Sequence, residues 1–147
     1  KNLDSKFDAY TIVKNNTVKI LNDNKYTYTI ADNFSAKDFP KEIISQENIH
    51  QLIDFNKLKS NYKSDDIILI NVKNGFDYNE LDLNKYVAKT YVYIYILNLK
   101  DQVLKFSESI AGTKYIEEPI ETINTDNLAA IMKNSIENTM QIIDKKY

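Results

Sequence analysis

Hydrophobic and polar residues alternate with a period of two in the middle of the chain. In the stretch TYVYIYIL (90–97), Val92, Ile94 and Ile96 alternate with three tyrosines. Successive side chains of a β-strand project to opposite faces, so this alternation predicts a long strand over residues 86–97. The run VLKFSESIAG, which follows after a polar turn, predicts a returning strand.

Two further patterns precede this hairpin. The aliphatic run DDIILINVK (65–73) is compact and rich in β-branched residues, which favours a strand buried on both faces. The Asn74–Gly75 pair that follows it favours a turn. Over residues 7–31, clusters of asparagine and aspartate separate short apolar runs, and because these are typical turn residues we predict two or three antiparallel strands there.

Helical spacing of apolar residues occurs in two places. Between about residues 40 and 60 it follows Pro40, a residue suited to the first turn of a helix, and we predict one or two helices with a break near Ser45, which would cap the second. From about Asp126, apolar residues recur at i, i+3, i+4 and i+7, which predicts a long amphipathic helix with Thr125 or Asp126 as its N-cap.

Together these elements predict an α+β fold. We expect a mainly antiparallel sheet with a long C-terminal amphipathic helix and one or two further helices packed on it. At 147 residues the chain has the size of one ordinary domain, so we expect a single domain over residues 1–147.

The pairing of the two long strands decides which face is buried, since a slip of one residue exchanges the faces. A loop with an odd number of residues, with Asn98 opposite Gln102, places Ile96 against Leu104 and forms a continuous aliphatic face. A two-residue turn instead mixes apolar and polar residues on both faces. We therefore prefer the odd loop and predict that the aliphatic face packs against the C-terminal helix.

The other face carries tyrosines, serines and a lysine. In the preferred register Tyr91, Tyr93 and Tyr95 lie opposite Ser109, Ser107 and Lys105. This face is either solvated, covered by the remaining helix, or an interaction surface, because tyrosine offers a large contact area with a polar tip. The candidate binding residues are Tyr91, Tyr93, Tyr95 and Lys105.

The amino-acid composition argues against several classes of function. All 19 basic residues are lysines and 21 residues are acidic, which disfavours nucleic-acid binding because phosphate recognition uses clustered cations and favours arginine. The mean hydropathy is −0.47 and no apolar run approaches 18 residues, so no transmembrane segment is expected in this chain. The absence of cysteine excludes disulfides, thiolate zinc sites and cysteine nucleophiles.

Candidate catalytic chemistry is sparse. His50 is the single histidine and lies in a helical run without a nucleophile-elbow motif, and the two glycines form no phosphate-binding loop. The loop DYNELD (77–82) offers oxygen ligands but lacks the glycine and terminal glutamate of an EF-hand. We therefore expect no catalytic residues, no metal and no cofactor, and we expect that the protein is not an enzyme.

Three stretches carry a resemblance to a known group: DDIILINV, the alternating strand that returns as VLKFSESIAG, and the terminal run LAAIMKNSIENTMQII. In their order they resemble small periplasmic α+β domains of bacterial accessory lipoproteins, such as activators of penicillin-binding proteins and the periplasmic domain of curli secretion channels. The resemblance covers about residues 65–146. It implies an envelope protein that binds a protein partner without catalysis.

The sequence is compatible with two cellular locations. The first residue, Lys1, is consistent with a removed leader, and we expect an exported protein, periplasmic or anchored to the outer membrane by a lipid upstream of this chain. The alternative is a small cytoplasmic binding protein, such as a toxin-neutralising immunity protein, because small acidic folds present carboxylates to basic partners. The sequence does not predict the oligomeric state.

Overall fold

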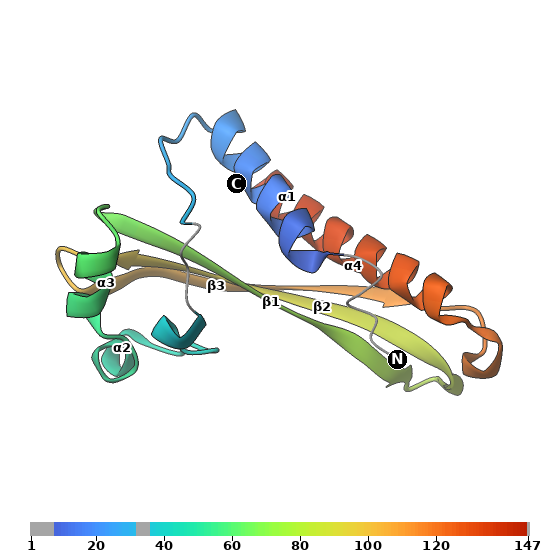
Figure 1. Ribbon diagram of the computed structural model, residues 1–147. Helices are drawn as coiled ribbons and strands as arrows, with labels where there is room; N and C mark the ends of the chain where they lie inside the picture. The colour runs from blue at the N-terminus through green and yellow to red at the C-terminus, as the bar shows by residue number, and fades with distance from the viewer. Residues whose placement is uncertain (1–7, 32–35, 147) are drawn as a thin grey trace. The chain divides into compact units, whose positions relative to one another are not determined.

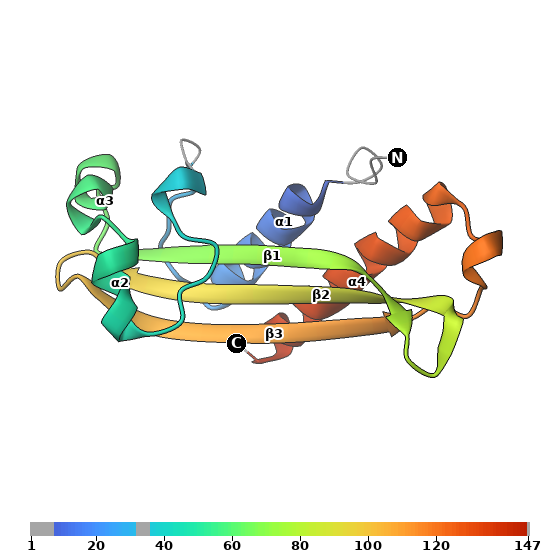
Figure 2. The ribbon, with the colours of Figure 1, turned by 90° about the horizontal axis from the view of Figure 1, so that it is seen from below.

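Three long strands form one antiparallel sheet in the order β1-β2-β3 (Figure 2). The computed structural model describes residues 8–31 and 36–146. Strand β1 comprises Asp66–Asn79, β2 Asp82–Asn98 and β3 Val103–Tyr115. The chain divides into two compact units that each take part of these strands. The first unit contains the segment up to Tyr28, Val72–Val92 and the segment from Ile110 onward, and the second contains Thr29–Asn71 and Tyr93–Ser109.

The first unit packs two helices, α1 (Ala9–Asp23) and α4 (Thr125–Lys146), which lie side by side (Figure 1). Lys19 of α1 pairs with Asp144 of α4 at 3.0 Å. The buried face of α4 repeats at three- and four-residue steps, as predicted for an amphipathic helix that packs on the sheet. Its buried residues are Ala129, Met132, Ser135, Ile136, Thr139, Met140 and Ile143. The short 3-10 helix η3 (Ile120–Thr122) precedes α4.

The predicted strands over residues 7–31 are wrong for the described part, residues 8–31, because α1 occupies Ala9–Asp23 and residues 24–31 form no strand; residue 7 lies outside the described residues. The carboxylate of Asp8 caps the helix by accepting a hydrogen bond from the Thr11 N–H at 3.2 Å. Within α1, Asn16 and Thr17 donate side-chain hydrogen bonds to the carbonyls four residues earlier, each at 2.7 Å. These residues, which favour turns in isolation, therefore bond to the helix backbone and do not interrupt it.

The second unit contains the short helices α2 (Gln46–Leu52) and α3 (Phe55–Asn61) and the 3-10 helix η2 (Ala36–Asp38). Helices and strands of this unit share one hydrophobic cluster, formed by Phe39, Ile43, Ile49, Ile53, Phe55, Leu58, Leu69, Tyr95, Leu97, Leu99 and Leu104. Two helices are present in this region, but the break between them lies at Ile53 and Asp54 and not near Ser45. Ser45 precedes the first of the two helices, and its side chain makes no capping hydrogen bond. A helix from Pro40 is not formed, because the 40–45 segment bonds to other parts of its unit.

The turns differ from the predicted ones. Asn74 and Gly75 lie inside β1, and the first hairpin turns at Glu80 and Leu81. The second hairpin has a loop of four residues, Leu99–Gln102, with Gln102 at a positive φ of 56°. The odd-numbered loop that we preferred is therefore wrong, and Leu104 packs in the same cluster as Tyr95 and Leu97.

The predicted N-cap of α4 is off by one residue. The side chain of Asn124 accepts a hydrogen bond from the Asn127 N–H at 2.9 Å, and its carbonyl accepts one from the Leu128 N–H. Asparagine is as good an N-cap as the residues that follow it. The helix itself begins at Thr125.

The aliphatic face of β2 packs on α4 as predicted within the first unit. Val92 is fully buried, and the Thr90 hydroxyl shares a buried hydrogen bond of 2.8 Å with the Ser135 hydroxyl of α4. Close by, Gly112 of β3 approaches Thr139, which lies one helical turn after Ser135 on the buried face of α4. Two strands and one helix thus meet at a row of small residues.

Candidate functional site

A hollow of about 300 Å³ lies in the second unit, where tyrosines of β2 and serines of β3 line its wall. The 42–44 segment, β2 and β3 each contribute part of its wall. The lining residues are Glu42, Ile43, Ile44, Tyr93, Tyr95, Ser107, Glu108 and Ser109. The hollow therefore brings together two of the four predicted binding residues, Tyr93 and Tyr95.

The 40–45 segment reaches the hollow because its backbone groups bond to the sheet. The Ile43 N–H donates to the Tyr95 hydroxyl at 3.3 Å, and the Lys41 carbonyl accepts from the Asn71 side chain at 2.8 Å. The side chain of Ile43 is buried in the cluster, whereas Ile44 is 77% exposed at the rim. The extended conformation thus anchors one isoleucine and leaves the next one facing solvent.

The two tyrosines in the hollow have different roles. Tyr95 is only 3% exposed and belongs to the hydrophobic cluster, so part of its ring supports the fold while its hydroxyl positions Ile43. Tyr93 is partly buried and packs against the same cluster. In this part of β2 the tyrosine face is therefore largely covered by other residues of the unit. Tyr93 is less buried than Tyr95 and is the tyrosine better suited to contact a ligand.

The lining of this hollow is aromatic and acidic. Glu42 and Glu108 provide two carboxylates, Ser107 and Ser109 provide hydroxyls, and no lysine is among the residues that line it. A tyrosine ring attracts a cation placed over its face, and a carboxylate attracts the same cation by charge. This combination fits the ammonium group of a lysine or the guanidinium group of an arginine.

The other two predicted binding residues lie elsewhere. Tyr91 falls in the first unit and is 39% exposed. Lys105 is in the second unit but pairs with Asp66 at 3.0 Å and does not line the hollow. The sequence did not point to Glu42 and Ile44, because they lie in a segment predicted to be helical. The one available signal in the sequence was Pro40, since proline suits irregular backbone as well as the first turn of a helix.

His50 and the acidic loop belong to no cluster of metal-ligating side chains within residues 8–31 and 36–146. The ring of His50 lies against Phe55, with centroids 5.5 Å apart, and lines neither hollow described here. In the hairpin turn, Asn79 and Asp82 accept hydrogen bonds from backbone N–H groups two residues later, at 2.9 and 3.1 Å. Among the described residues no three acidic or histidine side chains converge on a metal site.

The longest helix, α4, has polar residues along its whole length, and no helix in the described ranges has the length and apolar composition to cross a lipid bilayer.

These features define an α+β domain in which helices cover a three-stranded antiparallel sheet and an acidic, aromatic hollow opens on its surface. No protein-family model and no curated protein sequence matches the chain. Among solved structures, it resembles lipoprotein GNA1162 from Neisseria meningitidis, with a TM-score of 0.45 and 16% sequence identity. The match covers 87% of this chain and 82% of that one.

Proposed function

We propose that this chain is a bacterial envelope domain, exported or lipid-anchored, that binds a protein partner and has no catalytic activity. We propose further that the hollow around Tyr93 holds a lysine or arginine side chain of that partner. The observation that carries the proposal is the lining of the hollow, where two tyrosines and two carboxylates occur without a lysine. Such a site favours cations and excludes anions.

The envelope location is supported by the order of elements over residues 65–146. The resemblance to periplasmic accessory domains predicts a strand, a long hairpin and a last helix packed on the sheet, and this order is present. The complete gene sequence tests the location. A signal peptide with a lipobox cysteine upstream of Lys1 supports it, whereas a start codon directly before Lys1 contradicts it and favours a cytoplasmic partner-neutralising protein.

The chemistry of the hollow is tested with short peptides. The probes are capped pentapeptides with a central arginine or glutamine between glycines, titrated while backbone amide shifts are followed by NMR. We expect the arginine peptide to shift the amides of Ser107–Ser109 and the glutamine peptide to leave them unchanged. Equal responses to both peptides would contradict a cation site.

Matched variants identify the residues that bind the cation. Tyr93→Leu keeps an apolar side chain but removes the π face, and Glu108→Gln removes one charge. A cation–π contact contributes about 1–2 kcal/mol when partly desolvated, so Tyr93→Leu should weaken binding about 5- to 30-fold. Tyr115→Leu and Glu47→Gln make the same changes at exposed positions outside the hollow and should have no effect.

Tyr91 and Lys105 test how far the partner extends. Once a partner protein is identified, Tyr91→Ser and Lys105→Ala are measured against it alongside the Tyr93 variant. Weaker binding of the partner by these two variants, with unchanged peptide binding, assigns them to a larger interface around the hollow. Unchanged binding of both restricts the interface to the residues that line the hollow.

A further inference from the structure

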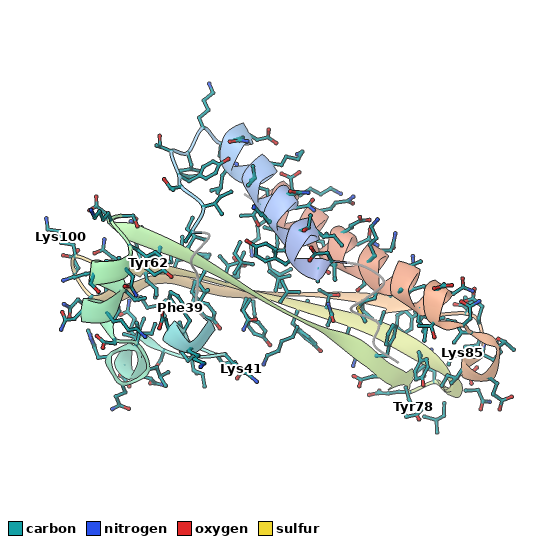
Figure 3. The ribbon with its side chains drawn as sticks, viewed as in Figure 1. Phe39, Lys41, Tyr62, Tyr78, Lys85 and Lys100 are labelled. Atoms are coloured by element: carbon teal, nitrogen blue, oxygen red, sulfur yellow. The ribbon has the colours of Figure 1, made fainter. Side chains whose placement is uncertain are left out.

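The hairpin that joins β1 and β2 in the first unit ends in exposed apolar side chains. Leu81, at the turn, is 94% exposed, and Leu83 and Tyr78 beside it are also exposed. The Tyr78 ring packs on Tyr86 with centroids 5.7 Å apart, which holds one side of the hairpin in place; Figure 3 labels Tyr78. Leucine does not stabilise a turn, because turn positions favour glycine, proline and small polar residues. We refer to Tyr78, Leu81 and Leu83 as the apolar tip.

Acidic residues predominate in the hairpin that carries the apolar tip and in the segment beside the base of that hairpin. Residues 74–89 and 115–126, which meet where the Ile116 N–H donates to the Tyr86 carbonyl at 3.2 Å, contain seven carboxylates and two lysines. Both lysines are engaged: Lys89 pairs with Asp77 at 2.9 Å, a hydrogen bond that raises the pKa of Lys89, and Lys85 lies 3.5 Å from Glu117. The tip is therefore apolar, and the residues of the hairpin and of the segment beside its base are mainly acidic; we call these residues the acidic surround.

A second hollow, of about 470 Å³, lies in the second unit and has the opposite character. It is lined by Lys59, Tyr62, Lys63, Ser64, Asp65, Leu99 and Lys100, so three lysines face one carboxylate. Within the described residues these three lysines form no ion pair, unlike Lys19, Lys57, Lys85, Lys89 and Lys105. Tyr62 and Leu99 give the hollow an apolar part. We call it the lysine hollow.

The lysine hollow is held by the backbone of the segments that line it. The Leu99 N–H donates to the Asp65 carbonyl, and the Tyr62 N–H donates to the Leu58 carbonyl, both at 2.8 Å. Leu99 is buried in the hydrophobic cluster and Tyr62 packs against it. The apolar part is therefore in place before any partner binds, and the cost of ordering it on binding is small.

We propose that the apolar tip of one copy of this chain docks in the lysine hollow of a second copy. Leu81 would contact Tyr62, which packs on the buried Leu99, while the acidic surround of the tip faces the three lysines. The two surfaces match in both charge and apolar content, which gives specificity as well as attraction. This inference does not depend on the proposed cation site, which uses a different hollow.

The contact has a consequence for assembly. It joins two different surfaces, so each bound copy keeps one tip or one hollow available for the next. Such a head-to-tail interface continues into a chain of copies, or ends where a ring closes. Because the attraction is partly between exposed charges, assembly weakens as salt screens them over about 8 Å at physiological ionic strength.

The test mixes two variants that each lose one surface. The tip variant carries Glu80→Gln and Leu81→Ser, and the hollow variant carries Lys59→Glu and Lys63→Glu. Sedimentation velocity measures the mass of the wild type, of each variant, and of their equimolar mixture. We expect the wild type to form species larger than a dimer as concentration rises, and each variant alone to stay monomeric. The mixture should form a 1:1 dimer and nothing larger, since it has one intact tip and one intact hollow.

Control variants separate loss of the contact from loss of the fold or of net charge. Lys133→Glu with Lys145→Glu makes the same charge change on the exposed side of α4, and Ile142→Ser removes an exposed apolar side chain there. Both should assemble like the wild type. The tip and hollow variants should each raise the dissociation constant at least about tenfold while keeping the circular dichroism spectrum of the wild type.

Three results would overturn the proposal. The first is a wild type that stays monomeric at millimolar concentration, and the second is a mixture of the two variants that does not pair. The third concerns anionic lipid, the other ligand that a lysine hollow attracts. If the monomer binds vesicles of phosphatidylglycerol, loses this binding in the hollow variant and never self-associates, the hollow belongs to a membrane contact.

Discussion

Gly112 is the residue at which a single added methyl group should disturb the fold most. It lies on β3 against α4, and a Cβ at this position would be 2.0 Å from the Thr139 Oγ1 and 3.2 Å from the Thr139 Cβ. Thr139 is fully buried, and its hydroxyl donates to the Ser135 carbonyl at 2.8 Å. Neither atom can move away without losing packing or this hydrogen bond.

The cost of Gly112→Ala follows from this geometry. Overpacking of a close-packed site costs about 1–3 kcal/mol, and a contact more than 1 Å too short places this substitution in the upper half of that range. We expect a loss of about 2 kcal/mol in the free energy of unfolding, measured by urea denaturation. For a chain of this length, that corresponds to a fall of about 4–8 °C in Tm.

Gly75 provides the matched control, since these two are the only glycines in the chain. A Cβ on Gly75 would meet nothing within 4 Å, and no glycine has a positive φ. Gly75→Ala should therefore stabilise the protein by about 0.4–1 kcal/mol, because alanine restricts the unfolded chain. Opposite signs for the two glycines are the expected result.

A double-mutant cycle identifies the atom responsible. Thr139→Ala removes the Oγ1 and leaves a Cβ at 3.2 Å, which small shifts can accommodate. Added to Gly112→Ala, it should therefore recover most of the lost stability, with a coupling energy of at least about 1 kcal/mol. If the two substitutions are additive, or if Gly112→Ala is harmless, the close approach of β3 to α4 is not as described here.

The remaining predictions concern single hydrogen bonds. Thr90→Val leaves the buried Ser135 hydroxyl without its partner and should cost about 1–3 kcal/mol in urea denaturation, whereas the double variant Thr90→Val/Ser135→Ala should cost much less; equal losses would contradict a direct bond. Tyr95→Phe should cost about 1 kcal/mol, because the Ile43 N–H loses its acceptor, and no loss would show that this bond does not matter. Hydrogen bonds from Thr11 lower the pKa of Asp8 below its ordinary 3.8, so its stabilisation of the helix start is present above that pH and is lost as pH falls through the lowered pKa; an NMR titration midpoint at or above 3.8 would contradict this.

The C-terminal helix was predictable because its pattern repeats over many turns. Polar and apolar positions of α4 alternate at helical spacing along its 22 residues, so no strand explains them. In α1 the same signal is short and interrupted by asparagine. Ile12, Asn16 and Ile20 lie four residues apart, so the polar Asn16 interrupts the apolar pattern. Its side-chain amide donates to the Ile12 carbonyl at 2.7 Å. That bond exists only once the helix has formed.

The lining of the candidate hollow was predictable only in part, for a related reason. Tyr93 and Tyr95 are visible in the alternation of β2, as are Ser107 and Ser109 in β3. Glu42 and Ile44 reach the hollow because the Ile43 N–H and the Lys41 carbonyl bond to residues more than 25 positions away along the chain. Local propensity carries no information about such contacts, and Pro40 fits both a helix start and an irregular segment.

The length of β2 explains why one row of tyrosines has two environments. At about 3.3 Å per residue its 17 residues span about 56 Å, whereas the 22 residues of α4 cover about 33 Å at 1.5 Å per residue. One helix therefore cannot bury one face of the whole strand. In β2 the buried residues are even-numbered from Ala88 to Ile94, and from Tyr95 to Leu99, which directly follows the strand, they are odd-numbered. The choice of a single core face from period-two alternation assumes one core, and a strand this long serves two. Tyr91 consequently meets solvent while Tyr95 lies in a core, although both belong to the same sequence pattern.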